Sequence, residues 1–296
     1  MMKHEQGLII KSVSGFYYVE AAGHIYECRA RGGFRNKDVS PLTGDRVRIE
    51  IPPTGMPMVA EIEPRKNSLV RPPVANLDML VMVVSTVKPT PNTGVIDKML
   101  VIAEYKGIEP ALVFTKTDLK EAEDIKALYQ SAGFLCFSVC KEESEDVHHL
   151  KEAMAGKICA FTGNSGVGKS TLLNLLDTKL LLTTSDISEK LGRGRHTTRH
   201  TELFALECGA LVADTPGFSS LDLDSGDKME KEELASCFRE FDPFLGNCRF
   251  SDCSHTKEKD CAVRQALSDG QISQSRYDSY LRQYEEIKAR DAGQYK

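Results

Sequence analysis

Alternating hydrophobic and polar residues between positions 7 and 62 predict five short β-strands. The runs are residues 7–13, 16–19, 25–30, 46–51 and 58–62. The pair Ser14-Gly15 between the first two runs is typical of a hairpin turn. Five short strands so close together favour a small β-barrel of the OB type, which we assign to residues 1–68.

A near-continuous apolar run at residues 77–84 changes the pattern, because it is typical of a buried parallel strand. Further strands and amphipathic helices then alternate. The strands are expected at 111–114, 134–137, 158–161 and 210–213, and the helices around 96–103, 125–129 and 171–176. This alternation predicts a doubly wound α/β domain over residues 69–222.

Helical patterns follow in residues 223–296, where we expect helices at 230–241 and 273–288. The second helix carries Tyr277, Tyr280 and other apolar side chains at packing intervals, which indicates a core or docking stripe rather than a reactive site. We therefore predict a separate helical domain at residues 223–296.

Composition excludes several classes of protein. The 296 residues are 41% hydrophobic and 27% charged, as in ordinary globular proteins, and a net charge of −5 argues against a wholly basic nucleic-acid coat. No apolar run approaches the roughly 20 residues of a membrane span, and Met1 to Gln6 do not form a secretion signal. We expect a cytoplasmic protein whose nine cysteines are thiols or metal ligands.

The segment Gly163–Ser170 fits the phosphate-loop pattern G-x-x-x-x-G-K-[ST] between a predicted strand and a predicted helix. In such a loop Lys169 reaches the β- and γ-phosphates, and the Ser170 hydroxyl binds Mg²⁺. The alternative is a glycine-rich connection without function. The predicted GTP-binding residues here are Gly163, Asn164, Ser165, Gly166, Val167, Gly168, Lys169, Ser170 and Thr171.

The segment Thr115-Lys116-Thr117-Asp118 follows a predicted strand and could select the base. A carboxylate such as Asp118 accepts both N1–H and N2–H of guanine, whereas adenine offers no such donor pair. The stem of Lys116 would lie along the base. Alone, such a Lys/Asp pair is more often solvated in a loop than bound to a base; the phosphate loop makes guanine the better interpretation.

These two segments resemble translational GTPases, whose guanine motif is N-K-x-D and whose S-A-K-like loop corresponds to Ser138, Val139 and Cys140. Thr115 stands where that family has asparagine, so a hydroxyl would have to brace the phosphate loop. Cys140 replaces lysine, so we expect only backbone contacts to the base from Val139 and Cys140.

The motif order resembles a circularly permuted GTPase, since Asp118 precedes Gly163. A loop suited to switch I lies at residues 192–199, and Asp214-Thr215-Pro216-Gly217 fits the D-x-x-G of switch II. With a barrel before and a cysteine cluster after, the whole chain resembles the ribosome small subunit-dependent GTPase A family. That resemblance implies a GTPase that acts in late maturation of the small ribosomal subunit and is stimulated by it.

Magnesium is expected to accompany GTP, because phosphoryl transfer depends on positioning and charge neutralisation. We assign this magnesium site to Ser170, a switch I threonine and Asp214, the last of which would hold a Mg²⁺-bound water. Thr197 and Thr198 are both candidates, and we favour Thr198.

Phe218 occupies the position at which many GTPases carry the glutamine that orients water, and it cannot perform that role. We therefore expect slow intrinsic turnover. The predicted catalytic residues are Lys169, which neutralises phosphate charge, and His196, which the family resemblance also supports. The alternative is that His196 and its neighbouring arginines bind RNA or phosphate.

Cys248, Cys253, His255 and Cys261 fall within fourteen residues. Three thiolates and one imidazole suit a single tetrahedral, structural Zn²⁺. The spacing is not that of a common zinc finger, but the family resemblance also implies zinc.

The expected partners are GTP or GDP and the small ribosomal subunit with its rRNA, with no membrane and a monomeric chain. Residues Arg29, Arg31, Phe34, Arg35 and Lys37 mix charge with an aromatic ring, as RNA-binding grooves do, although a solvated loop explains them equally well. A GTP-gated RNA-binding module with incidental hydrolysis is the main alternative. A P-loop kinase or ATPase is disfavoured by Asp118.

Overall fold

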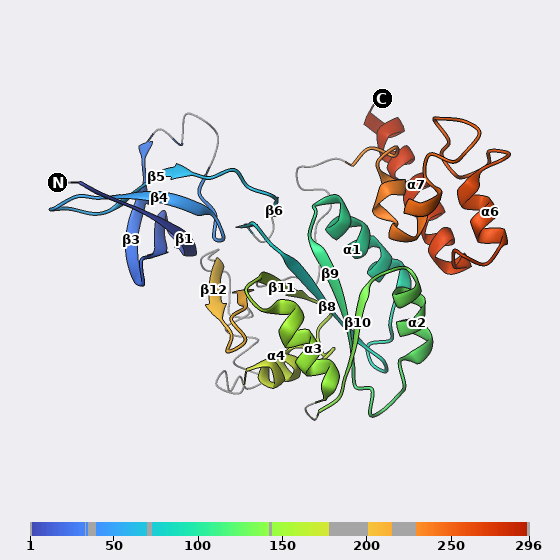
Figure 1. The fold of residues 1–296 in the computed structure, drawn as a ribbon, viewed down its shortest axis with the longest axis horizontal. Coiled ribbons are helices and arrows are strands. Elements are labelled where there is room, and N and C mark those ends of the chain that lie inside the picture. Colours follow the sequence, from blue (N-terminus) through green and yellow to red (C-terminus); the bar gives the residue numbers. More distant parts are fainter. Residues whose placement is uncertain are drawn as a thin grey trace.

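The computed structural model describes residues 2–32, 34, 40–69, 73–141, 144–177, 201–214 and 229–294. The α/β domain lies between the N-terminal barrel and the helical C-terminal domain (Figure 1). Within these described ranges, no helix combines the length and apolar character needed to span a membrane.

The N-terminal barrel has the predicted five strands. They are β1 (Lys3–Val13), β2 (Phe16–Ala21), β3 (His24–Ala30), β4 (Arg46–Ile51) and β5 (Met58–Ile62). The order is β1-β2-β3-β5-β4, and β1 also pairs with β4, so the sheet closes on itself. Ile9, Val19 and Val47 are fully buried inside it. The predicted OB-type barrel is confirmed.

The α/β domain has the sheet order β10-β9-β8-β11-β13-β12. Its strands are β8 (Met79–Ser85), β9 (Glu109–Thr115), β10 (Leu135–Val139), β11 (Ile158–Thr162), β12 (Thr201–Ala205) and β13 (Leu211–Asp214). All pair in parallel except β12, which runs antiparallel to β13. Every residue of β8 is buried, which explains its continuous apolar sequence.

Among the described residues, four helices cover this sheet: α1 (Thr93–Tyr105), α2 (Glu123–Ser131), α3 (Glu145–Met154) and α4 (Lys169–Leu176). Leu100 of α1 and Tyr129 of α2 belong to one buried cluster, whereas Leu150 of α3 and Leu173 of α4 belong to another. Helices thus cover both faces, and the predicted doubly wound domain is confirmed.

A continuous sheet joins the barrel to the α/β domain, because β12 pairs with β1 as well as with β13. In this pairing Lys11 lies opposite Glu202, and their side chains form an ion pair at 2.7 Å. The buried Thr43 hydroxyl donates to the carbonyl oxygen of Thr201 at 2.9 Å. A short pair, β6 (Ser68–Leu69) and β7 (Val74–Ala75), completes the junction.

The C-terminal domain differs from the prediction at residues 230–241. Instead of one α-helix there are two 3₁₀ segments, η3 (Leu234–Cys237) and η4 (Arg239–Phe244), followed by α6 (Ala262–Ser268) and α7 (Gln274–Gln294). Phe238 interrupts the helical path with extended backbone. That conformation lets Phe238 stack on Phe241 and meet Tyr280 edge to face, with all three rings buried.

Candidate nucleotide and metal sites

The phosphate-loop segment connects the end of β11 to the start of α4. Gly163 has φ = +144°, and a Cβ atom there would lie 2.4 Å from the Val83 carbonyl oxygen, so no larger residue fits. Gly168 caps α4 in the left-handed conformation, at φ = +104°. Glycine at these positions lets the loop turn tightly and present its backbone at a helix N-terminus, where phosphate binds favourably.

Lys169 directs its charge into this loop. Its Nζ donates to the carbonyl oxygens of Gly163 at 2.5 Å and Asn164 at 2.9 Å. Ser170 lies beside it in the first turn of α4. A cation and a helix N-terminus together form an environment that favours a polyphosphate.

The guanine-motif segment contacts the phosphate loop directly. Thr115, the last residue of β9, is buried, and its hydroxyl donates to the carbonyl oxygen of Val167 at 2.5 Å. The Nζ of Lys116 donates to the carbonyl oxygens of Gly166 at 2.8 Å and Lys88 at 2.5 Å. The loop is therefore held at two successive carbonyls, and at Thr115 a hydroxyl makes the contact.

Replacing Thr115 with valine should weaken GDP and GTP binding roughly tenfold, because a buried carbonyl left without its donor costs about 1–3 kcal/mol. Thr115→Ser is the matched control, since it keeps the hydroxyl and should keep most of the affinity. Fluorescent-nucleotide titration measures both. Affinities for Thr115→Val within twofold of the unmodified protein would contradict a bracing role.

A pocket of about 530 Å³ lies where the guanine motif meets the phosphate loop. Its volume suits a small organic ligand. Its lining includes the predicted residues Thr115, Lys116, Asp118, Val139, Cys140, Gly168 and Thr171. These come from the carboxyl ends of β9 and β10 and the start of α4, the usual ligand position in an open α/β sheet.

The pocket also has a lining that sequence patterns miss. Lys88 follows the carboxyl end of β8, Lys141 follows that of β10, and Val87, Leu119 and Leu172 complete the wall. None occupies a motif position. The only available signal is that each lysine lies just after a predicted strand whose end should face the ligand.

Other predicted GTP-binding residues do not line this pocket. Thr117 is half-buried in the loop after β9, and Asn164, Ser165 and Gly166 are exposed on the phosphate loop next to the buried Val167. The Ser138 amide donates to Asp146 Oδ2 at 2.6 Å. Its hydroxyl is buried and has no hydrogen-bond partner among the described atoms.

The structure describes only some of the predicted catalytic and magnesium-binding residues. Lys169 and Ser170 begin α4, and Asp214 is the last residue of β13. The side chain of Asp214 and the whole of His196 and Thr198 lie outside what the structure describes. Asp214 is nevertheless placed at the carboxyl end of the strand next to β11, which leads into the phosphate loop.

The cysteine and histidine cluster has the geometry of a metal site. The four potential ligand atoms of Cys248, Cys253, His255 and Cys261 all lie within 4.8 Å of one another. Nδ1 of His255 is 3.5 Å from the Cys248 sulfur and 3.4 Å from the Cys261 sulfur, and the two sulfurs are 3.8 Å apart. A tetrahedral ion with ligands at about 2.0–2.3 Å requires separations of about 3.5–3.8 Å. These residues could therefore hold a metal ion.

Burial shifts the pKa values of the cluster residues. Burial raises the pKa of the Cys253 thiol to about 12 and also raises that of Cys261, because a thiolate there loses hydration. Burial lowers the pKa of His255, which favours the neutral imidazole that metals bind. A bound cation would offset the cost of forming the thiolates.

Surrounding side chains fix the loop that carries the ligands. Burial alone would raise the pKa of Glu258, but hydrogen bonds from the Ser254 hydroxyl and from backbone amides lower it to about 2. Tyr277 donates to the His255 carbonyl oxygen at 2.8 Å, and Tyr280 donates to that of Ser254 at 2.7 Å. Two tyrosines of α7 thus hold the loop that carries the candidate metal ligands.

Two family descriptions match the chain: RsgA N-terminal domain over residues 6–57 and RsgA GTPase over residues 62–224. The small ribosomal subunit biogenesis GTPase RsgA of Caldanaerobacter subterraneus subsp. tengcongensis is 43% identical, and the alignment covers 100% of both chains. The Enterococcus faecalis protein of the same name is 44% identical over 98% of this chain and 97% of that one.

Two solved structures share the fold. YjeQ from Thermotoga maritima superposes with a TM-score of 0.80 at 32% identity, covering 96% of this chain and 99% of that one. YloQ, described as a circularly permuted GTPase, gives 0.79 at 34% identity over 97% and 96%. The family resemblance and the permuted motif order are confirmed. The chain belongs to the RsgA GTPase family and is a circularly permuted GTP hydrolase.

Proposed function

We propose that this chain hydrolyses GTP to GDP and phosphate during late maturation of the small ribosomal subunit, which it binds through rRNA and which stimulates hydrolysis. The observation that carries the proposal is 43% identity, along the entire chain, to a GTPase named for biogenesis of that subunit. We propose that the protein acts as a cytoplasmic monomer. The domain limits proposed are residues 1–68, 69–222 and 223–296.

In the proposed complex the guanine base occupies the pocket beside Asp118, and the phosphates lie along the loop that begins at Gly163. Support comes from the pocket itself, because it joins Asp118 to Gly168 and Thr171 across two segments far apart in sequence. The charged carboxylate accepts the two guanine donors, and the Lys169 ammonium neutralises phosphate charge.

Ser170, Thr198 and Asp214 would hold Mg²⁺, which when bound stabilises the charge that develops on the phosphates. Because Phe218 cannot orient water, we assign that task to His196. The four-residue cluster of the C-terminal domain would hold one structural Zn²⁺, since three thiolates and an imidazole leave no open position for catalysis.

The decisive experiment measures GTP turnover with and without purified small ribosomal subunits, and with the protein-free RNA of that subunit. We expect the intact subunit to raise turnover at least about tenfold and free RNA to have little effect. Stimulation as large by free RNA would favour the alternative, a GTP-gated RNA-binding module. No stimulation by either would contradict the proposed function.

Replacing His196 with alanine should lower the subunit-stimulated turnover by a factor on the order of 10². This is the loss expected for a side chain that orients the attacking water or accepts its proton. GTP affinity should stay within about twofold. His148→Ala, at an exposed position in α3, serves as the control. Near-normal stimulation of His196→Ala would exclude His196 from catalysis.

A further inference from the structure

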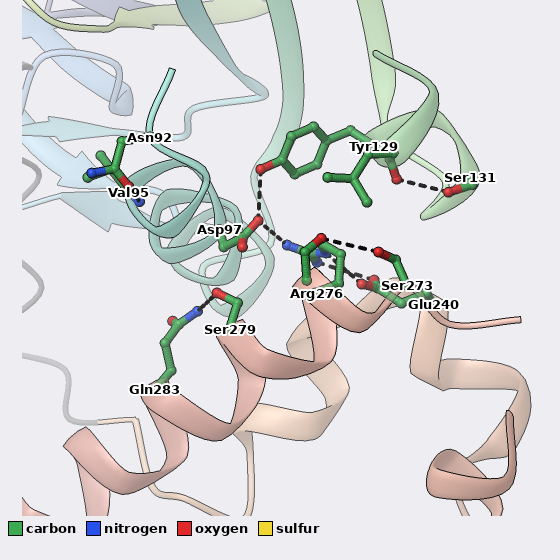
Figure 2. Close-up of polar contacts among 12 residues, drawn as sticks. Asn92, Val95, Asp97, Tyr129, Ser131, Glu240, Ser273, Arg276, Ser279 and Gln283 are labelled. Carbon is green, nitrogen blue, oxygen red and sulfur yellow. Dashed lines mark hydrogen bonds and ion pairs between the residues drawn. The ribbon is translucent and has the colours of Figure 1, made fainter. Parts of the chain in front are cut away.

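A buried guanidinium joins the C-terminal domain to the α/β domain. Arg276 of α7 has only 1% of its side chain exposed. It donates through Nε and Nη2 to the two carboxylate oxygens of Glu240, at 2.6 and 3.2 Å, and through Nη1 to Oδ1 of Asp97, at 2.6 Å. The same Asp97 oxygen accepts from the Tyr129 hydroxyl at 3.0 Å (Figure 2).

These contacts cross the domain boundary. Glu240 and Arg276 belong to the C-terminal domain, Asp97 lies on α1, and Tyr129 lies on α2. Because Asp97 and Glu240 are almost as buried as the arginine, each carboxylate depends on Arg276 for neutralisation. The arginine therefore links the C-terminal domain directly to α1 and, through the shared Asp97 oxygen, to Tyr129 of α2.

Aromatic rings fix the direction of the guanidinium. Its central carbon lies 4.7 Å from the ring centroid of Phe238 and 5.5 Å from that of Phe134. Phe238 comes from the C-terminal domain and Phe134 from the segment just before β10. Contact with two aromatic rings and paired hydrogen bonds together suit the guanidinium of arginine and not the ammonium of lysine.

The two helices held by this network begin directly after loops of the base pocket. Val87 and Lys88 line the pocket shortly before α1, and Asp118 and Leu119 line it shortly before α2. The hydrogen bond from Lys116 Nζ to the Lys88 carbonyl oxygen also joins these two loops. A shift of α1 relative to α2 would therefore change the shape of the pocket.

We propose that Arg276 is a positioning residue for guanine recognition: through Asp97 and Tyr129 it fixes α1 and α2, and with them both base-pocket loops. This inference rests on the guanine site proposed above. Coupling of this kind is reciprocal, so nucleotide in the pocket must also strengthen the docking of the C-terminal domain.

Arg276→Met should raise the dissociation constant of GDP about 5- to 30-fold, in the lower part of the range of ordinary coupling between sites. It should also reduce the preference for GDP over IDP, because inosine lacks the 2-amino group that a well-placed Asp118 recognises. Lys98→Met is the matched control: it removes an exposed ion pair with Glu286 between α1 and α7, the helices that Arg276 also joins, and should change neither quantity.

Loss of folding alone would lower the active fraction and leave the GDP-to-IDP ratio of the folded protein unchanged. Tyr129→Phe provides a milder variant, because it removes one hydroxyl and keeps the buried ring. We expect a two- to fivefold rise in the GDP dissociation constant. Unchanged affinity and unchanged base preference in both variants would overturn the proposal.

A second test uses the unmodified protein. Saturating GDP should slow amide hydrogen exchange in η3, η4 and α7, none of which touches the pocket. If GDP binds tightly and exchange in these segments is unchanged, the coupling is refuted while the guanine site stands. If GDP is bound no better than ADP, the proposed function itself fails.

Discussion

Asp118→Asn should change the nucleotide specificity of this protein from guanine to xanthine. The carboxylate accepts two hydrogen bonds from guanine, and hydrogen bonds to a charged group contribute about 1.5–3 kcal/mol each. Asparagine removes the charge and turns an amide N–H toward the 2-amino group of guanine, so GDP binding should weaken by a factor on the order of 10²–10⁴. The asparagine amide can instead donate to the 2-oxo group of xanthine and accept from N1–H. Titration with fluorescent GDP and XDP measures the change.

Asp124→Asn supplies the control for this result. Asp124 is an exposed carboxylate in the first turn of α2, only six positions further along. It changes the net charge by the same amount without touching the pocket lining. An Asp118→Asn protein that still prefers GDP would show that another group reads the base.

Cys261→Ser should abolish the proposed zinc binding and, with it, the ordered structure of the C-terminal domain. Structural zinc contributes about 10–16 kcal/mol of binding free energy, comparable to or greater than the total stability of most domains. Cys261 is buried, and its sulfur approaches those of the other ligands. We expect zinc content to fall from one ion per chain towards zero, with loss of exchange protection in α6 and α7.

Cys208→Ser is the matched substitution, because Cys208 is half-buried and lies outside the cluster. It should leave zinc content at one ion per chain, as measured by elemental analysis. A Cys261→Ser protein with undiminished zinc would contradict the ligand assignment. Chelation of the unmodified protein should reproduce the structural effect of the substitution.

The elements that sequence predicts well are those with strong local signals. The run at residues 77–84 had to be buried on both faces, and β8 is. The conformation of the phosphate loop can be predicted from its own sequence, because the backbone at Gly163 leaves no space for a Cβ atom. Such features depend on neighbouring residues, which periodicity and motif spacing capture.

The features that escape prediction depend on distant residues. The prediction of a helix at residues 230–241 is wrong, because Phe238 has extended backbone and packs against Tyr280. In the sequence, Arg276 is one charged residue among many on a polar helix. In the structure it is buried, because it binds Asp97, which lies 179 positions earlier. Lys88 joins the pocket only because the sheet brings β8 beside β9 and β11.

The pairing of β1 with β12 can form only late in synthesis, because the two strands lie far apart in the sequence. Lys11 leaves the ribosome about 190 residues before its partner Glu202, which at 5–20 residues per second is roughly 10–40 s. The barrel can close earlier, since β4 and β5 follow β1 within about 60 residues. Meanwhile one stretch of β1 remains an open strand edge, where a charged lysine disfavours pairing with another chain. Lys11, which pairs with Glu202 of the α/β domain in the folded protein, thus also disfavours association of the incomplete chain with other chains.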